Sequence, residues 1–349
     1  MNDAIIIKAI YNEYNLYKYH NKKKGNLINK FRPYSNKVTD YLLLVLSFFF
    51  VPIVPFIPFF NKVSISTSSY DCNMYFICSE KSKIIFSKNT KSNFIDITRG
   101  DKYHVTLKGY LNYLKVIYLF FYTIRLKIWF YPSVTLLYQM IRIYGYLSEN
   151  KGSIKEINIT NHYDRWAIFF GEIANEFDIK LNIYQHGILD CDYKPFYKIP
   201  KVNNVYAYDE LSGNIFSCDL ILDCNKVIIK KPTVGVAEVK QHKKSVLIIG
   251  TVDVTYLTIE KKIISNLGAD IFIYYKPHPL NHNDCFFLYR DTFQLLGKNE
   301  LLPLVDIVIH TNSTLALEYS GNDIYADYID LYQTNNIQDV FNKINKVFL

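Results

Sequence analysis

Polar residues that can bind phosphate or transfer protons follow four predicted β-strands of this 349-residue chain. The four segments are Gln185-His186-Gly187, Gly250-Thr251, Lys276-Pro277-His278-Pro279 and Thr311-Asn312-Ser313-Thr314. Ligands of α/β proteins bind at the carboxyl ends of the strands, which is where these segments stand. Lysine, histidine and hydroxyl side chains all donate hydrogen bonds to phosphate oxygens. The pattern therefore predicts an anion-binding site.

Segment 311–314 joins a predicted strand, 305–313, to a predicted helix, 313–321. A helix N-terminus offers free N–H groups and the positive end of the helix dipole, to which the hydroxyls of Ser313 and Thr314 add donors. The alternative is an ordinary N-cap, because serine, threonine and asparagine cap helices without binding any ligand.

In segment 276–279, His278 stands between two prolines at the end of a predicted strand, so its backbone has little freedom. A fixed imidazole close to Lys276 suits the binding of a phosphate group. A surface turn is the alternative. His278 precedes Ser313 by 35 residues, and the pair of segments is more specific than either one alone.

The dipeptide His278-Pro279 at a strand end, followed by Ser313-Thr314 at a helix start, is similar to motifs of the bacterial sialyltransferases and polysialyltransferases. Transferases that use CMP-activated ulosonic acids, and some capsule and teichoic-acid polymerases, look alike in this half. The resemblance covers roughly residues 155–325. It implies the GT-B fold, in which two Rossmann-like domains face a central cleft.

The same resemblance implies that His278 binds the CMP phosphate and helps CMP to leave, and that Ser313 and Thr314 bind this phosphate. Glu318, one turn into the helix, would reach the ribose hydroxyls, or would be a solvated carboxylate. The strand ends complete the predicted donor site with Gly250, Thr251, Lys276, Pro279 and Asn312.

The implied reaction moves a sialic acid or related ulosonic acid from a CMP-sugar to a cell-surface glycan, as in capsule or lipooligosaccharide, with inversion. The alternatives are the same fold with a UDP-sugar or CDP-polyol donor, and a non-catalytic capsule-assembly protein. A CMP-sugar carries one phosphate, so no metal or other cofactor is expected. The expected partners are the donor and a glycan or lipid-linked acceptor.

Such a transfer needs a general base for the acceptor hydroxyl, and His186 is the predicted base because an imidazole titrates near neutral pH. A structural histidine in a turn is the alternative reading of His186. Asp190 and Asp192 are the other candidate bases. With Cys191 they also spell the metal-binding DxD motif of another glycosyltransferase fold, but the context does not fit it.

From residue 150 onward the chain alternates predicted strands and helices, which indicates an α/β fold with parallel sheets. The predicted strands are 154–160, 179–187, 202–210, 245–251, 270–279, 305–313 and 323–330, and the predicted helices are 164–178, 259–267, 313–321 and 336–348. The pattern predicts two α/β halves that meet within 205–245. We assign residues 1–205 to an acceptor-side domain and 206–349 to a nucleotide-sugar-binding domain.

The first third of the chain is basic: residues 1–130 hold 19 Lys and Arg against 7 Asp and Glu. It also holds an uncharged run, 41–60, and an aromatic segment, 110–131. Prolines at every third position from Pro52 break the run, which predicts a helix over about 40–51 and then an extended segment. Segment 41–60 could contact the membrane surface, belong to a buried core or span the membrane. Segment 110–131 could be a half-buried helix or a helix at the membrane interface.

Composition excludes a disordered chain, because half of the residues are hydrophobic. The six cysteines lack metal-site spacing and are expected to be reduced and mostly buried. The N-terminus does not resemble a secretion signal, so a cytoplasmic protein, peripheral on the inner face of a bacterial membrane with anionic lipid, is expected. The chain carries no recognisable nucleic-acid-binding module, so nucleic acid is not expected as a partner.

Overall fold

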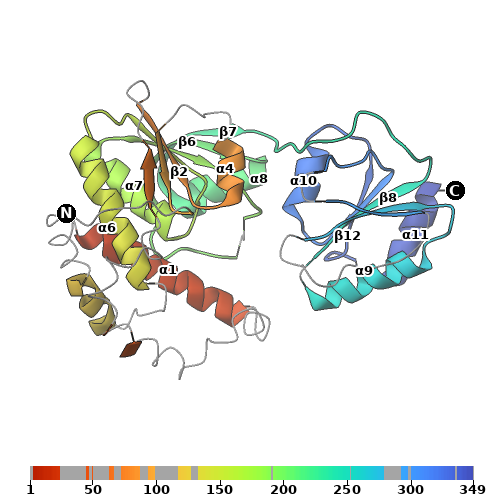
Figure 1. The fold of residues 1–349 in the computed structure, drawn as a ribbon, viewed down its shortest axis with the longest axis horizontal. Coiled ribbons are helices and arrows are strands. Elements are labelled where there is room, and N and C mark those ends of the chain that lie inside the picture. The colour runs from red at the N-terminus through yellow and green to blue at the C-terminus, as the bar shows by residue number, and fades with distance from the viewer. Residues whose placement is uncertain are drawn as a thin grey trace. The chain divides into compact units, whose positions relative to one another are not determined.

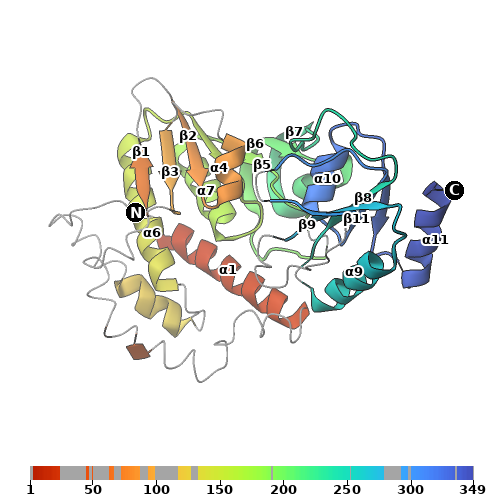
Figure 2. The same ribbon diagram turned by 45° about the vertical axis from the view of Figure 1, so that its right-hand side comes forward.

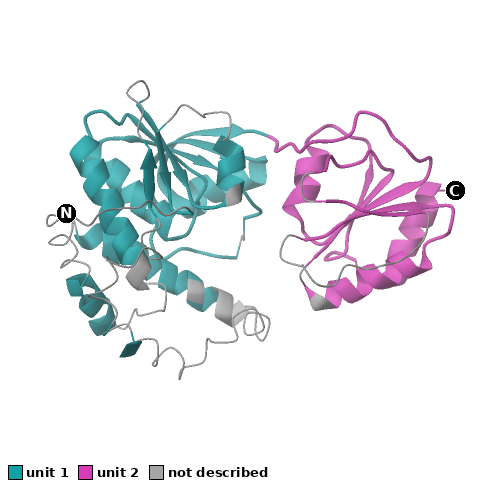
Figure 3. Cartoon of the chain, in the orientation of Figure 1, with its two compact units in different colours: residues 1–230 teal, residues 231–349 magenta. Residues whose placement is uncertain are grey.

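The structure is a computed structural model that describes residues 3–23, 45–46, 49, 63–66, 72–86, 93–98, 117–126, 133–189, 192–251, 253–278, 292–297, 300–334 and 336–348. The chain forms two compact units, residues 1–230 and 231–349, which Figure 3 colours separately. This division lies within the predicted 205–245. The predicted boundary after residue 205 would fall inside strand β6 (Ile199–Ala207). It would also separate the next strand from its sheet, because both strands belong to the sheet of unit 1.

Unit 1 contains a seven-stranded sheet in the order β1-β3-β2-β4-β5-β6-β7. Its other strands are β1 (Ser64–Ser66), β2 (Asn73–Ile77), β3 (Asn93–Asp96), β4 (Glu156–Ile159), β5 (Lys180–Tyr184) and β7 (Ile221–Ile229). Only the pairing of β1 with β3 is antiparallel. Without β1, the order reads 2-1-3-4-5-6, which is a doubly wound arrangement whose strand order reverses between β2 and β4.

Helices pack on both faces of this sheet (Figure 1). They are α1 (Asp3–Lys23), α4 (Glu80–Phe86), α6 (Ser133–Asn150), α7 (Arg165–Phe177) and α8 (Glu210–Ile215), followed by a short π-helix, η4 (Phe216–Leu220). Phe76 of β2 faces α7, with ring centroids 5.0 Å from Trp166 and 4.5 Å from Phe170. Its neighbour Tyr75 faces the other way, 5.1 Å from Phe86 of α4. This alternation of neighbouring side chains places α7 and α4 on opposite faces.

The regular α/β pattern begins at β2, and not at residue 150 as the sequence suggests. Strands β1, β2 and β3 all precede residue 150, and β2 lies inside the sheet and pairs with β4. Strand β2 is almost wholly buried, so its apolar run shows no alternation that would mark it as part of a sheet. Strand β7 was also not predicted, because it lies at the sheet edge and mixes exposed polar and apolar residues.

Unit 2 contains a five-stranded parallel sheet in the order β10-β9-β8-β11-β12. The strands are β8 (Ser245–Ile249), β9 (Phe272–Lys276), β10 (Phe293–Leu295), β11 (Ile307–His310) and β12 (Asp327–Asp330). Counted within the unit, the order is 3-2-1-4-5, which is typical of Rossmann-like folds and reverses between β8 and β11. The predicted strands of this half are confirmed with shorter bounds, while β10 was not predicted.

Helices α9 (Val254–Asn266) and α11 (Ile337–Phe348) cover one face of the unit 2 sheet, and α10 (Thr314–Ser320) covers the other (Figure 2). Alternate residues of β8 show the division: Val246 and Ile248 pack with α9 and α11, whereas Leu247 and Ile249 pack with α10. Helix α9 begins five residues earlier than predicted, because Asp253 caps it by accepting the N–H of Thr255.

The segments predicted to contact a membrane lie partly outside the described residues. Of 41–60, residues 45, 46 and 49 are described; they are helical, and Val45, Leu46 and Phe49 are exposed. Of 110–131, residues 117–125 form a helix that buries Leu119 and Phe120. No helix among the described residues is both long enough and apolar enough to cross a membrane.

Four of the six cysteines are described, and all four are free thiols. Cys72 and Cys218 are exposed, and Cys78 and Cys224 are half-buried. The prediction of mostly buried cysteines is therefore wrong for these four. Cys72 lies just before β2 and Cys218 lies within η4, so both are outside the strands of the sheet.

Candidate functional site

The structure brings three of the four predicted segments to one edge of the unit 2 sheet. Strand β8 lies between β9 and β11, and all three are parallel, so segments 250–251, 276–278 and 311–314 follow neighbouring strand ends. The N–H of Gly250 donates to the carbonyl of Lys276 at 2.8 Å, which ties the first segment to the second. This edge is also the point where the strand order reverses. Pro279 lies outside the described residues.

A buried carboxylate, which was not predicted from the sequence, forms hydrogen bonds that position the loop after β8. Glu260 of α9 accepts the N–H of Thr251 at 3.1 Å and the hydroxyl of Tyr275 at 3.0 Å. The same hydroxyl explains Gly250, because a Cβ there would lie 2.5 Å from Tyr275 Oη. Burial raises the pKa of Glu260 to about 7, and the two hydrogen bonds oppose this shift. Gly250 and Thr251 are therefore fixed in place by a group that titrates near neutrality.

Replacing Glu260 by glutamine is expected to stabilise unit 2 above pH 7. The folded protein keeps a proton on Glu260 between about pH 4.5 and 7, where the unfolded chain has lost it, so the free energy of unfolding falls as pH rises through this window. Glutamine can accept from Thr251 and donate to Tyr275 without this penalty, which is worth up to about 3 kcal/mol. Urea unfolding at pH 5 and pH 8, followed by circular dichroism, measures the difference.

Tryptophan fluorescence provides an internal control for that experiment, because Trp166 is buried in unit 1 and unit 2 contains no tryptophan. The substitution should leave the fluorescence transition unchanged. If the free energy of unfolding had the same pH dependence in the wild type and the variant, Glu260 would not retain a proton in the folded protein.

The second segment places Lys276 and His278 at the end of β9, both half-buried. The ammonium of Lys276 donates to the carbonyl of Gly297. Burial lowers the pKa of Lys276, and the charge of Glu300 opposes this. Burial also lowers the pKa of His278, so its imidazole is mostly neutral at pH 7 and acquires charge when an anion binds beside it.

The third segment contains both an N-cap and an unusual backbone conformation. Ser313 Oγ accepts the N–H of Leu315 at 3.2 Å, so the ordinary N-cap reading is correct, while the hydroxyl proton can still be donated to a ligand. Asn312 has a φ of 44°, and its N–H donates to Asp330 Oδ1 at 3.1 Å. Thr314 starts α10, and Glu318 lies half-buried within it. Two further atoms of β11 and its loop, His310 Nδ1 and Thr311 Oγ1, are buried without a hydrogen bond among the described residues.

The fourth segment belongs to the sheet of unit 1, where His186 follows β5. His186 Nδ1 is within hydrogen-bonding distance of the carbonyl of Thr160, which follows the neighbouring strand β4. A carbonyl oxygen only accepts, so Nδ1 carries the proton and Nε2 keeps its lone pair. Burial lowers the pKa of His186, while the Thr160 carbonyl and Asp164 oppose this shift. His186 is therefore a neutral imidazole with a basic Nε2.

A second histidine, His162, shares this arrangement and was missed by the sequence analysis. Its ring centroid lies 4.9 Å from that of His186, and its Nδ1 is 3.3 Å from the same Thr160 carbonyl. Burial lowers the pKa of His162 to about 3, with a further decrease from His186. His162 thus stays uncharged at neutral pH and adds no positive charge beside His186.

Further polar residues follow β2 and β4, where the strand order of unit 1 reverses. Cys78 Sγ donates to Asn161 Oδ1 at 3.2 Å, and Asn161 Nδ2 donates to Asp164 Oδ2 at 2.6 Å. Asp164 caps α7 by accepting the N–H groups of Trp166 and Ala167. The sequence did contain a signal, since Asn-His-Tyr-Asp at 161–164 directly follows a predicted strand. Asp192 is exposed, and Asp190 lies outside the described residues.

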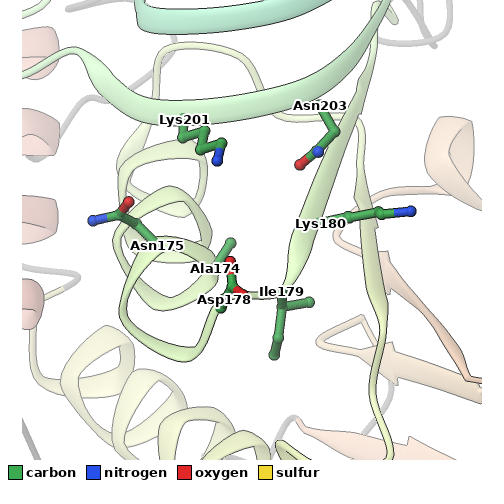
Figure 4. Close-up of a pocket in the computed structure, with 7 residues that line it drawn as sticks. All are labelled: Ala174, Asn175, Asp178, Ile179, Lys180, Lys201 and Asn203. Atoms are coloured by element: carbon green, nitrogen blue, oxygen red, sulfur yellow. The ribbon is translucent and has the colours of Figure 1, made fainter.

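Figure 4 shows a pocket at the other end of the unit 1 sheet, between the end of α7 and the start of β5. Its volume is about 60 Å³, far below the roughly 300 Å³ of small ligand pockets. It contains no predicted site residue, and it is lined by Ala174, Asn175, Asp178, Ile179, Lys180, Lys201 and Asn203. We assign no function to it.

Comparison with known proteins gives no family for this chain. No protein-family model matches it, and no curated protein matches it. The two strand-end sites are therefore the basis for the function proposed below.

Proposed function

We propose that the chain is a glycosyltransferase that moves a sialic acid or related ulosonic acid from a CMP-sugar to a cell-surface glycan. One observation supports this most: segments 250–251, 276–278 and 311–314 meet at the edge of a parallel sheet where its strand order reverses. They bring a glycine turn, an imidazole and hydroxyl donors to one place. Such a set suits a nucleotide that carries one phosphate.

In this proposal, His278, Ser313 and Thr314 bind the phosphate of the donor, and Glu318 binds the ribose. The bond between the anomeric carbon and the phosphate oxygen breaks, and CMP leaves with its charge stabilised by these donors. The imidazole of His278 is neutral in the free protein and takes up a proton from solvent when the anionic donor binds beside it. It transfers this proton to the phosphate oxygen as the bond to the anomeric carbon breaks. Lys276 must exchange the Gly297 carbonyl for the phosphate if it contributes. No resident metal is required.

The acceptor hydroxyl attacks the anomeric carbon from the opposite side, which inverts its configuration. Its proton passes to Nε2 of His186, the atom that the Thr160 carbonyl leaves basic. This step requires the C-terminal edges of both sheets to face one cleft, as in the GT-B arrangement. His186 belongs to unit 1 and the donor residues to unit 2, so catalysis would need both units.

We also propose that the protein binds the inner face of the bacterial membrane, where lipid-linked acceptors are found. The helix at 117–125 and the residue after it expose Tyr118, Phe121, Tyr122 and Leu126 beside the exposed Arg125. Aromatic rings and basic side chains are favoured at lipid headgroups. Failure to float with vesicles that contain phosphatidylglycerol would contradict this part of the proposal.

The donor is tested by incubating the purified protein with CMP-sialic acid and a panel of oligosaccharide acceptors, and measuring CMP release. UDP-sugars and a CDP-polyol are assayed in parallel, since the same strand ends can bind their phosphates. CMP, UDP and CDP are also compared by thermal shift, because a ligand that binds only the folded state raises the midpoint.

Release of CMP from CMP-sialic acid that depends on the acceptor supports the proposal. Turnover of a UDP-sugar or of the CDP-polyol, which itself releases CMP, with no turnover of CMP-sialic acid would move the proposal to that donor class. Absence of both turnover and nucleotide binding would favour a non-catalytic protein.

A further inference from the structure

Two tyrosines meet at the C-terminal edge of the unit 2 sheet, beside the candidate phosphate loop 311–314. Tyr256 lies in the first turn of α9, which follows β8, and Tyr332 lies two residues after β12. Their ring centroids are 6.2 Å apart, and the rings are tilted by 39°. Strand β11 runs between β8 and β12, so the pair borders the end of β11. Tyr332 is 67% exposed, which leaves much of its ring open to a ligand.

A single carboxylate ties this pair to the loop. Asp330 Oδ1 accepts the N–H of Asn312 at 3.1 Å and the N–H of Tyr332 at 2.9 Å. Two more hydrogen bonds stabilise the turn after Asp330: the carbonyl of Asp330 accepts from the N–H of Gln333 and from the hydroxyl of Thr334. The ring of Tyr332 is thus carried by a rigid turn whose position relative to Ser313 is fixed.

We infer that Tyr332, backed by Tyr256, is the platform on which the base of the donor nucleotide stacks. This inference rests on the proposed function, because it assigns the base to a site whose phosphate end is segment 311–314. Every nucleobase has a π-face, and an exposed aromatic ring held next to a phosphate site offers the matching surface. Because the loop of Ser313 and the turn of Tyr332 both donate to Asp330, a phosphate on the loop and a base on the ring would be held by adjacent segments.

The charge around the platform favours cytosine over uracil. Burial is the largest cause of the raised pKa of Tyr256, and the charges of Asp253 and Asp330 add to it, so two carboxylates lie near this tyrosine. The second oxygens of Asp253 and Asp330 accept no hydrogen bond from the described residues. The amino group of cytosine donates hydrogen bonds, whereas the matching carbonyl of uracil only accepts them. We therefore expect the site to prefer CMP to UMP.

The test measures dissociation constants of the full-length protein for CMP, UMP and ribose 5-phosphate by calorimetry. Tyr332→Ala is expected to weaken CMP binding by roughly 5- to 150-fold, the range for loss of one base–aromatic stack. Binding of ribose 5-phosphate, which has no base, should change less than about twofold on the same argument. Tyr332→Phe should bind CMP as the wild type does, because it keeps the ring and loses only the hydroxyl.

Tyr325→Ala is the matched control. Tyr325 is 97% exposed and precedes β12, so it lies at the opposite end of that strand, and its removal should leave all three constants unchanged. Equal weakening of CMP and ribose 5-phosphate in Tyr332→Ala, or unchanged CMP binding, would overturn the platform. UMP binding as tight as that of CMP would overturn the base preference. A wild-type protein that binds neither CMP nor ribose 5-phosphate would contradict the proposed function itself.

Discussion

Replacing His278 by alanine is expected to lower the rate of CMP release by about 10²–10⁴-fold, the range for loss of a group that transfers a proton in the transition state. His278 follows β9 at the edge where the strand order of unit 2 reverses, next to the loop at 250–251. Burial lowers its pKa, so the ring is neutral before the donor binds. Alanine removes the only imidazole of segment 276–278, and with it the group that takes up a proton when the donor binds and transfers it to the leaving phosphate.

His242→Ala provides the matched control in the same unit. His242 stacks on Phe272, the first residue of β9, with ring centroids 3.7 Å apart, so it lies at the opposite end of that strand. The His242 variant should retain the wild-type rate. CMP release is measured at saturating donor for both variants, and far-UV circular dichroism checks that both are folded. A His278→Ala variant with wild-type turnover would remove His278 from the mechanism.

The donor side of the site could be predicted because it depends on strand ends. In a parallel sheet the carboxyl ends of neighbouring strands share one edge, so segments 250–251, 276–278 and 311–314 had to meet once their strands were adjacent. Strands β8, β9 and β11 are nearly continuous apolar runs, which is what burial on both faces requires. The sequence therefore contains both the strands and the residues that follow them.

The supporting residues could not be predicted in the same way. Glu260 lies in the middle of α9, and Asp330 closes a strand, so neither position differs from a solvated carboxylate in the sequence. Their roles arise from tertiary contacts with Tyr275 and Asn312, which are 15 and 18 residues away in the chain. Only the fold shows that these carboxylates hold the two loops in place.

Unit 1 was predicted less well, since its strand β2 is short and lies far in the chain from the strands that sequence periodicity identifies. Residues 97–132, which include the helix at 117–125, separate β3 from α6 and the strands after it. The polar residues after β2 were consequently not linked to those after β4. Cys78 and Asn161 are 83 residues apart, yet their side chains form a hydrogen bond. His186 was found because its own strand, β5, was predicted from the sequence and ends in a tight turn.

Replacing His186 by asparagine is expected to lower kcat by about 10²–10⁴-fold, with little change in the donor KM. The asparagine amide can donate to the Thr160 carbonyl, as Nδ1 of the imidazole does, but it has no basic nitrogen in place of Nε2. The substitution therefore removes the base and keeps the local hydrogen bond. The donor KM is retained because the donor residues belong to unit 2.

The pH dependence distinguishes a lost base from a structural effect. A general base acts in its neutral form, so the wild-type kcat falls as pH drops through the pKa of His186. Burial lowers this pKa below the ordinary 6.5, which places the acid limb of the profile below pH 6.5. The His186→Asn variant should lose this limb together with the rate. A variant that keeps the limb would assign the base to another residue, and Asp192→Asn, at an exposed position, tests the one other predicted base that lies among the described residues.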